Sequence, residues 1–337
     1  MTKLAVLGAG SWGTALAHVA ALKTTNDVRI WSHNANQVAE INQRHTNAKY
    51  LPNATLSDNL VAYADMAEAV AGVDVVLSVV PTKATREVAR QLADILAEQA
   101  HTVIIAHATK GLEQGTFKHV SEMLAEEIPA HNRAAIVVIS GPSHAEDVVK
   151  NDITAVSVAS DIEAAAQVVQ ETFAYGYFRP YLNHDLYGSE LVAALKNIMA
   201  IGSGALTGLG YGDNAKAALL TRGLAEMMRL GEVLGVPGST FVGLAGIGDL
   251  IVTGMSPNSR NYRAGQQLGE GKTLSEVQTD MGMVIEGVGT TKAVHELALA
   301  KNVDMPITAA IYRVLYEEQP LVEAITSLMT RDLKAED

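Results

Sequence analysis

Short apolar runs alternate with amphipathic stretches along the first half of the chain. The runs are rich in β-branched residues and occupy residues 3–8, 27–31, 74–80, 102–108, 134–140 and 154–160. Strands that are apolar on both faces and separated by helices are typical of a parallel sheet covered on both sides. The pattern therefore predicts an α/β fold built on a doubly wound parallel sheet.

The pattern changes after about residue 185. Strand-like runs cease, and long stretches rich in Ala, Leu and Met follow, such as residues 214–235 and 290–302. Aromatic, Pro and Asn residues at 175–188 interrupt both periodicities, which indicates a boundary. We predict a first domain over residues 1–182 and a nearly all-α second domain over residues 183–337.

The composition narrows the class of protein. The 337 residues suffice for two domains, and 48% are hydrophobic whereas 5% are aromatic, as in soluble α/β enzymes. A net charge of −12 opposes general binding to nucleic acids or anionic membranes. There is no cysteine, no signal-peptide pattern and no evident apolar run near the ~18 residues of a membrane span. We expect a cytoplasmic protein with no nucleic-acid partner and no integral membrane segment.

A glycine motif follows the first apolar run. VLGAGSWGTALA places Gly8, Gly10 and Gly13 in a G-x-G-x-x-G between an expected strand and an expected helix. In Rossmann-type domains these glycines allow a tight turn, close approach of a pyrophosphate, and close helix packing. The helix N-terminus adds N–H groups for the phosphates. We predict dinucleotide binding here; the alternative is a glycine turn without a ligand.

The tip of the second expected strand bears on the choice of dinucleotide. NAD sites usually carry an acidic residue there for the ribose 2′-hydroxyl, but this chain has Ser32, His33 and Asn34. These side chains can donate hydrogen bonds to a 2′-phosphate, which an acid would repel. We therefore expect NADPH as cofactor, with NADH tolerated. His33 is equally well explained as a solvated loop residue.

Two loops follow later strands, at the edge where ligands bind in open α/β sheets. One places Lys110 after the run 102–108, and the other places Gly141, Ser143 and His144 after the run 134–140. Lys110 could bind a phosphate or polarise a carbonyl group. The alternative is an ordinary surface lysine.

A lysine interrupts an apolar helical stretch in the second half. LVAALKNIMA would suit a buried helix except at Lys196, and lysine is rarely buried without a partner. The preceding acid, Glu190, lies about 120° away around the helix and cannot pair with it. Asp249 is a candidate partner, although it could also cap a helix. A desolvated lysine has a lowered pKa and can exchange a proton near neutral pH. The alternative is a lysine that reaches solvent past the helix end.

The segment PNSRN resembles a helix start, with Asn258 or Ser259 as cap. Arg260 and Asn261 would then lie in the first turn, where exposed N–H groups and a guanidinium favour a phosphate. A solvated basic helix is the alternative. Glu286, in a glycine-rich turn, could bind a ribose hydroxyl or lie on the surface.

Motifs from end to end resemble those of one enzyme family. In chain order they are GAGSWGTALA, ATKGLE, SGPSHAE, LKNIMAIGSGA, NAKAALLTRGLAEM, GIGDLIVT, NSRN and VIEGVGTTK. The chain is similar to the bacterial NAD(P)-dependent glycerol-3-phosphate dehydrogenases, which reduce dihydroxyacetone phosphate to sn-glycerol 3-phosphate for phospholipid synthesis. The resemblance implies a small phosphorylated substrate. No metal is expected, since the cationic lysines replace a Lewis acid.

The resemblance also implies roles for individual residues. Lys196 would exchange the proton at the C2 oxygen of the substrate, and Lys110 would touch both substrate and cofactor. The other residues implied at the substrate are Gly141, Ser143, Asp249, Ser259, Arg260 and Asn261. Those implied at the cofactor are Gly8, Gly10, Ser11, Trp12, Gly13, His33, Lys110, Ala145, Arg260, Val284 and Glu286.

The chain departs from many relatives at a few positions. Val192 and Ala193 stand where glycines are common, His144 where Phe is common, and residues 253–256 where a cysteine often occurs. Two other functions stay open: a lysine-using dehydrogenase of the 6-phosphogluconate or 3-hydroxyacid type, and a dinucleotide-sensing regulator without turnover. If the protein assembles, a homodimer is the expected form.

Overall fold

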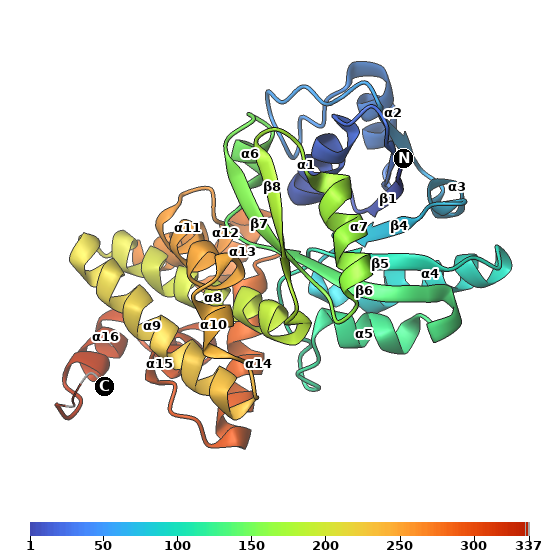
Figure 1. The fold of residues 1–337 in the computed structure, drawn as a ribbon. Coiled ribbons are helices and arrows are strands. Elements are labelled where there is room, and N and C mark those ends of the chain that lie inside the picture. The colour runs from blue at the N-terminus through green and yellow to red at the C-terminus, as the bar shows by residue number, and fades with distance from the viewer. Residues whose placement is uncertain (334, 336–337) are drawn as a thin grey trace. The chain divides into compact units, whose positions relative to one another are not determined.

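The computed structural model describes residues 1–333 and residue 335, and the chain divides into two compact units (Figure 1). Unit 1 comprises Met1–Lys110 and Lys118–Glu190, and unit 2 comprises Gly111–Phe117 and the chain from Leu191 onward. The predicted boundary after residue 182 stays a prediction.

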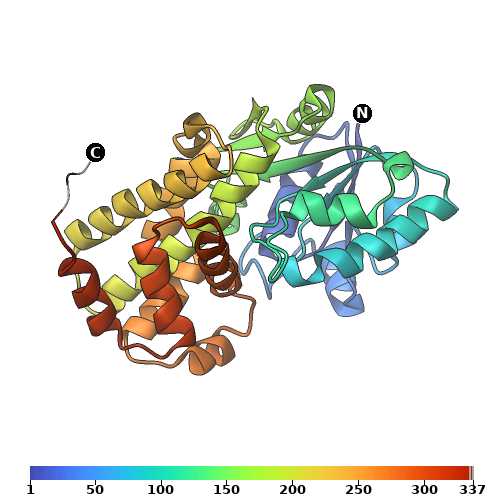
Figure 2. The ribbon, with the colours of Figure 1, turned by 90° about the horizontal axis from the view of Figure 1, so that it is seen from below.

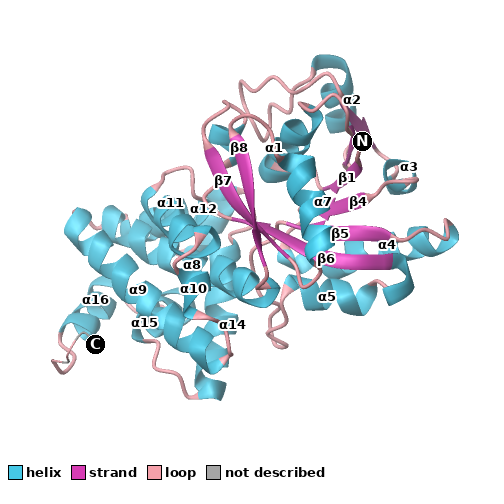
Figure 3. Cartoon of the chain, in the orientation of Figure 1, coloured by secondary structure: helices cyan, strands magenta, loops and turns pink. Residues whose placement is uncertain are grey.

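Unit 1 is built on one eight-stranded sheet with the strand order β3-β2-β1-β4-β5-β6-β7-β8 (Figure 3). All neighbouring strands pair in parallel except β6 and β7, which are antiparallel. The expected doubly wound sheet is confirmed, with this one antiparallel pair as a departure. The strands are β1 (Lys3–Leu7), β2 (Asp27–Trp31), β3 (Leu60–Tyr63), β4 (Val75–Ser78), β5 (Val103–His107), β6 (Arg133–Ser140), β7 (Thr154–Ala159) and β8 (Phe178–Asn183).

Two of these strands were not predicted. β3 has only four residues, with alternating burial, so it lacks a continuous apolar run. β8 lies inside the segment 175–188, where the sequence pattern predicted no strand. β8 is an edge strand, where Pro180 is tolerated because one side of the strand makes no ladder hydrogen bonds.

Helices cover both faces of the sheet, as the apolar runs predict. In β1, Leu4 and Val6 belong to one buried cluster, whereas Ala5 and Leu7 belong to another. Successive side chains of a strand point to opposite faces, so each face has its own core. The helices of unit 1 are α1 (Ser11–Ala21), α2 (Ala35–Arg44), α3 (Met66–Val70), α4 (Thr85–Glu98), α5 (Val120–Glu127), α6 (Ala145–Val148) and α7 (Glu163–Phe173), with 3₁₀ turns at Thr82–Ala84 and Ala130–Asn132.

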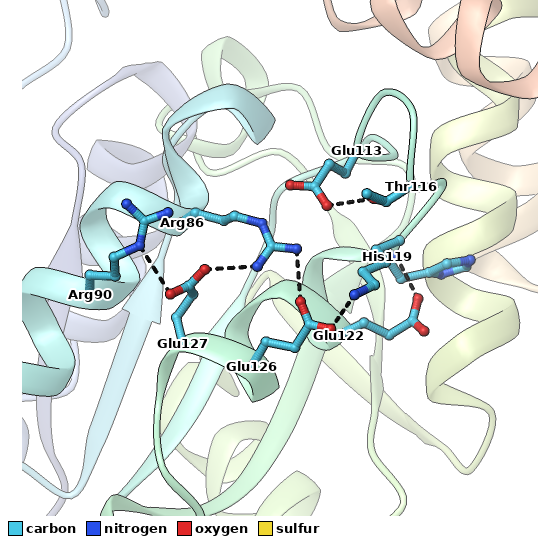
Figure 4. Close-up of polar contacts among 9 residues, drawn as sticks. Arg86, Arg90, Glu113, Thr116, His119, Glu122, Glu126 and Glu127 are labelled. Atoms are coloured by element: carbon cyan, nitrogen blue, oxygen red, sulfur yellow. Dashed lines mark hydrogen bonds and ion pairs between the residues drawn. The ribbon is translucent and has the colours of Figure 1, made fainter.

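An ion-pair network joins α4 to α5 on the surface of unit 1 (Figure 4). Arg86 contacts Glu127 at 2.7 Å and Glu126 at 2.8 Å, and Arg90 contacts Glu127 at 3.0 Å. Exposed pairs contribute little each, but several charges that share partners hold the two helices in register.

In the described part of unit 2 every element is helical (Figure 2), as predicted for the second half of the chain. Helix α8 begins in unit 1 and continues into unit 2. The helices are α8 (Leu186–Gly208), α9 (Asp213–Val233), α10 (Gly238–Phe241), a π-helical turn (Leu244–Gly248), α11 (Asp249–Met255), α12 (Arg260–Gly269), α13 (Leu274–Met281), α14 (Glu286–Lys301), α15 (Pro306–Tyr316) and α16 (Leu321–Met329).

Glycines let α8 and α12 pack with their backbones in contact. A Cβ on Gly265 would lie 1.9 Å from the Ile201 oxygen, and one on Gly204 would lie 1.9 Å from the Tyr262 oxygen. No side chain larger than hydrogen fits at these positions. The close packing fixes the first turn of α12 against the middle of α8, where Lys196 lies.

Within the described residues, two segments have the length and mean hydropathy of a membrane-crossing helix. They are α8 and the segment Gly238–Met255, each with a mean hydropathy of 1.3 over 18 residues. The window in α8 is 89% buried inside the protein, whereas that in Gly238–Met255 is 44% buried. A core helix passes the same test, and α8 has that character.

Candidate active site

The three glycines of the turn between β1 and α1 are required for three different reasons. Gly8 has φ +111°, a conformation that favours glycine. A Cβ on Gly13 would lie 2.0 Å from the Gly8 oxygen, so helix and turn pack too closely for a side chain. Apart from its neighbours in the chain, no atom of the described residues lies within 4 Å of a Cβ built on Gly10, so the space above it is open. This open cradle fits the close approach of a pyrophosphate.

Helix α1 begins directly at this turn. Its N-cap is Gly10, and its first turn contains no acidic residue, so the N-terminal N–H groups keep their attraction for an anion. Ser11 and Trp12 are the first two helical residues. The Ser11 hydroxyl donates to the Tyr50 oxygen at 3.0 Å, and the Trp12 ring packs against the core of unit 1.

The tip of β2 is organised differently from the expectation. The Ser32 hydroxyl donates to Gln37 Oε1 at 2.6 Å. The side-chain oxygen of Asn34, Oδ1, caps α2 by accepting from the N–H groups of Asn36 and Gln37. The single hydrogen of Ser32 is thus engaged with Gln37, and its expected donation to a 2′-phosphate stays a prediction. His33 is exposed.

The loops after β5 and β6 bring Lys110 and Ser143 to one carbonyl group. Lys110 Nζ donates to the Gly141 oxygen at 3.4 Å, and Ser143 Oγ donates to it at 2.9 Å. Gly141 has φ +148°, and a Cβ there would lie 3.0 Å from Val156 Cα. Ala145 follows as the first residue of α6 and is buried.

A buried ionic cluster lies near these loops within unit 1. The carboxylate of Glu190 accepts from the Ser121 N–H at 2.8 Å and lies 3.1 Å from His107 Nε2. Burial alone would raise the pKa of Glu190, but His107, His119 and Ser121 outweigh burial, so its pKa is lowered. Glu190 is therefore engaged away from Lys196, as the helix geometry predicted.

Lys196 is buried and paired in unit 2. Its Nζ lies 2.9 Å from Asp249 Oδ1 and donates to Thr253 Oγ1 at 2.5 Å. Thr253 Oγ1 in turn donates to Asp249 Oδ1 at 3.0 Å, and Lys196 and Asp249 are 4% and 1% exposed. The predicted pairing of Lys196 with Asp249 is confirmed. The alternative of a lysine that reaches solvent is wrong, and Asp249 is the first residue of α11 rather than its cap.

Asparagines tie α8, α12 and α14 together beside Lys196. Asn261 Nδ2 donates to Asn197 Oδ1 at 2.9 Å, and Asn261 Oδ1 accepts from the Gly287 N–H at 2.9 Å. A Cβ on Gly287 would lie 2.8 Å from the Asn197 oxygen. The amide of Asn261 is thus fixed in orientation.

The start of α12 has the geometry of an anion site. Ser259 is the N-cap, and its hydroxyl accepts from the Tyr262 N–H at 3.2 Å, which confirms one of the two predicted caps. Arg260 is the first helical residue, and its Nη1 lies 3.5 Å from the Val284 oxygen. Glu286 begins α14 close to Val284 in the chain. The first turn of α12 contains no acidic residue.

Several residues of these sites were not singled out from the sequence. Thr253 lies four residues after Asp249, and helical spacing would have placed it on the same face had α11 been expected to be a helix. Asn197, which pairs with Asn261, follows Lys196 directly in the chain. Gln37 and Asn47 contact the glycine turn, as described below.

A doubly wound sheet with a glycine turn at its first strand, followed by a helical unit with a buried, paired lysine, is typical of two-domain dinucleotide-dependent dehydrogenases. The particular family follows from the comparisons. The family model for the NAD-dependent glycerol-3-phosphate dehydrogenase N-terminus matches residues 3–166, and that for its C-terminus matches residues 185–326. The chain belongs to this family.

Similar sequences and solved structures support the same family. The chain is 67% identical over all of its length to a glycerol-3-phosphate dehydrogenase [NAD(P)+] of Leuconostoc mesenteroides, and all of that protein is covered. A crystal structure of glycerol-3-phosphate dehydrogenase from Coxiella burnetii has a TM-score of 0.91 at 40% identity and covers 98% of this chain and 99% of its own. The enzyme GPD1 of Saccharomyces cerevisiae has a TM-score of 0.81 at 28% identity, with 98% and 99% covered.

Proposed function

We propose that this protein reduces dihydroxyacetone phosphate to sn-glycerol 3-phosphate, reversibly and with a nicotinamide dinucleotide, in the cytoplasm, and so supplies glycerophospholipid synthesis. The observation that carries the proposal is the buried Lys196, held by Asp249 and Thr253 and followed along the helix by the Asn197–Asn261 pair. A buried ammonium that is held by two oxygens is suited to protonate an alkoxide.

The substrate phosphate is assigned to the start of α12. Exposed N–H groups of the first turn, the positive end of the helix and the Arg260 guanidinium provide a local cationic site in a protein of net charge −12. Ser259 and Asn261 lie in the same turn. The resemblance to the family also assigns Lys110, Gly141 and Ser143 to the substrate.

The reduction adds a hydride to the C2 carbon of the substrate and a proton to the C2 oxygen. The dinucleotide, when bound, supplies the hydride. Lys196 donates a proton from Nζ to the C2 oxygen as the carbonyl becomes an alcohol, and it regains a proton from water. Asp249 and Thr253 hold the ammonium and restrict its motion, which is the role of a preorganised group in catalysis.

The dinucleotide pyrophosphate is assigned to the glycine turn. The open space above Gly10 and the start of α1 fit the pyrophosphate. NADPH is the proposed preferred form, with His33 as donor to the 2′-phosphate. The residues assigned to the cofactor are Gly8, Gly10, Ser11, Trp12, Gly13, His33, Lys110, Ala145, Arg260, Val284 and Glu286.

A steady-state assay tests the proposal. The purified protein should oxidise NADPH, and NADH less efficiently, when dihydroxyacetone phosphate is added. It should not do so with 3-oxoacid phosphates. Turnover only with the 3-oxoacid phosphates would favour the other lysine-using dehydrogenases, and tight NADPH binding without turnover on any substrate would favour a sensing regulator.

A further inference from the structure

Two carboxamides outside the assigned site hold the carbonyl group of Ala9, the residue between the first two glycines of the turn. Gln37 Nε2 lies 2.6 Å from the Ala9 oxygen, and Asn47 Nδ2 lies 3.0 Å from it. A carbonyl oxygen has two lone pairs and no hydrogen, so both nitrogens donate and the oxygen is saturated. The direction of this carbonyl group is therefore fixed from two sides.

The two carboxamides belong to a closed network. Gln37 Nε2 also donates to Asn47 Oδ1 at 3.0 Å, and Asn47 Nδ2 also donates to Thr14 Oγ1 of α1 at 2.8 Å. Because the nitrogen of Gln37 faces Ala9, its Oε1 faces Ser32 and accepts the Ser32 hydroxyl at 2.6 Å. Asn47 is fully buried and Ser32 is 3% exposed. We call Ser32, Gln37 and Asn47 the turn brace.

The turn brace acts on a group that a dinucleotide needs. A trans peptide is planar, so the Ala9 carbonyl and the Gly10 N–H point in opposite directions. Fixing the Ala9 carbonyl toward Gln37 and Asn47 aims the Gly10 N–H to the other side of the turn. Hydrogen bonds accepted by a carbonyl also polarise its peptide group and strengthen the N–H as a donor.

We infer that Gln37 and Asn47 are positioning residues that set the affinity for the dinucleotide, by holding the Ala9–Gly10 peptide plane in the orientation that binds a pyrophosphate. This inference rests on the proposed use of a dinucleotide. In this inference Ser32 orients the carboxamide of Gln37 and does not bind the 2′-phosphate, because its hydroxyl hydrogen is donated to Gln37 Oε1. The pyrophosphate is common to NADPH and NADH, so the brace acts equally on both.

The variant Gln37→Met removes every hydrogen bond of this side chain while keeping its length. We expect the Kd values for NADPH and NADH, measured by isothermal titration calorimetry, to rise by about tenfold each, the effect of one buried hydrogen bond or slightly more. The kcat with saturating cofactor should change by less than about twofold, since the brace lies away from the reacting groups. Gln37→Glu should bind at least as poorly as Gln37→Met, because a carboxylate would face the Ala9 oxygen.

Asn42→Ala is the matched control on the same helix. The carboxamide of Asn42 pairs with the backbone of Ala62 in β3, at 2.9 and 2.7 Å, and does not touch the turn. This variant should lower the melting temperature as Gln37→Met does, while both Kd values stay within about twofold of the parent. An equal rise of Kd in Asn42→Ala would show that the effect is general destabilisation of α2, and unchanged Kd values in Gln37→Met would overturn the inference.

Ser32→Ala separates the brace from direct recognition. We expect both Kd values to rise by the same small factor, about two to three, because Gln37 loses one support. A rise for NADPH alone would place Ser32 on the 2′-phosphate and overturn its role in the brace. These binding measurements do not depend on the substrate, so the inference can hold even if dihydroxyacetone phosphate is not turned over.

Discussion

Replacing Asp249 by Asn tests the buried pair on which the assigned role of Lys196 depends. The substitution keeps the shape of the side chain and one acceptor for Lys196 and Thr253, but it removes the negative charge. At 2.9 Å the attraction between the two charges is about 6 kcal/mol for an effective dielectric constant of ~20. Much of this attraction only offsets the desolvation of the two groups.

The net cost follows from the unpaired ammonium that the substitution leaves behind. Removing one member of a buried pair typically costs about 3–5 kcal/mol, and the amide oxygen of Asn still accepts a hydrogen bond. We therefore expect the free energy of unfolding of unit 2 to fall by about 3 kcal/mol, near the lower end of this range. Urea unfolding followed by circular dichroism measures it.

A second consequence concerns pH. The carboxylate favours the ammonium form of Lys196, so Asp249→Asn should lower the pKa of that lysine. Reduction needs the protonated lysine, and the alkaline limb of the kcat/KM profile should therefore move to lower pH. Asp280→Asn is the control, because Asp280 forms an exposed pair with Lys272 and should change neither property. Equal effects of the two substitutions, or an unmoved alkaline limb in Asp249→Asn, would refute the reasoning.

Other consequences can be measured separately. Gly265→Ala should destabilise unit 2 by about 3 kcal/mol and raise the KM for the substrate, because the new Cβ meets the backbone of α8 at 1.9 Å. Gly238→Ala should do neither, because its Cβ would meet Met228 Cε at an ordinary 3.9 Å, and a normal melting temperature for Gly265→Ala would contradict the close packing. His33→Ala should raise the KM for NADPH by about tenfold and leave that for NADH nearly unchanged, whereas equal changes would remove His33 from the 2′-phosphate. Because the folded pKa of Glu190 is below 4.5, its charge stabilises the fold above that pH and ceases to do so as the pH falls through the folded pKa. The stability difference between the parent and Glu190→Gln should therefore shrink in acid below pH 4.5, and a difference that is constant from pH 7 to pH 3 would contradict the ionic cluster.

The six predicted apolar runs coincide with β1, β2, β4, β5, β6 and β7. Of these, β1, β4, β5 and β6 contribute buried side chains to both cores, which explains why their runs are continuous. β3 and β8 lie at the ends of the sheet, and a partly solvated strand carries polar residues and even proline. Edge strands therefore leave a weak pattern in the sequence.

The site could be predicted where one residue breaks a strong pattern. Lys196 stands out because it is the one charged residue of the stretch LVAALKNIMA. Its own helix offers no partner, so an acid from another segment was needed. Thr253 could not be assigned without knowing that α11 is a helix. Gln37 and Asn47 contact Ala9 although they lie 28 and 38 residues from it in the sequence. Asn and Gln are so common on polar helix faces and in loops that their presence does not indicate such contacts.

The central claim is that Lys196 is the proton donor of a hydride transfer, and the most direct measurement compares Lys196→Met and Lys196→Arg with the parent enzyme. We predict that kcat for the reduction of dihydroxyacetone phosphate falls by about a thousandfold in both variants, since Met carries no proton and Arg does not release one. The Kd for NADPH should stay within about twofold, because Lys196 is not among the residues assigned to the dinucleotide. A kcat within tenfold of the parent in either variant would contradict the account.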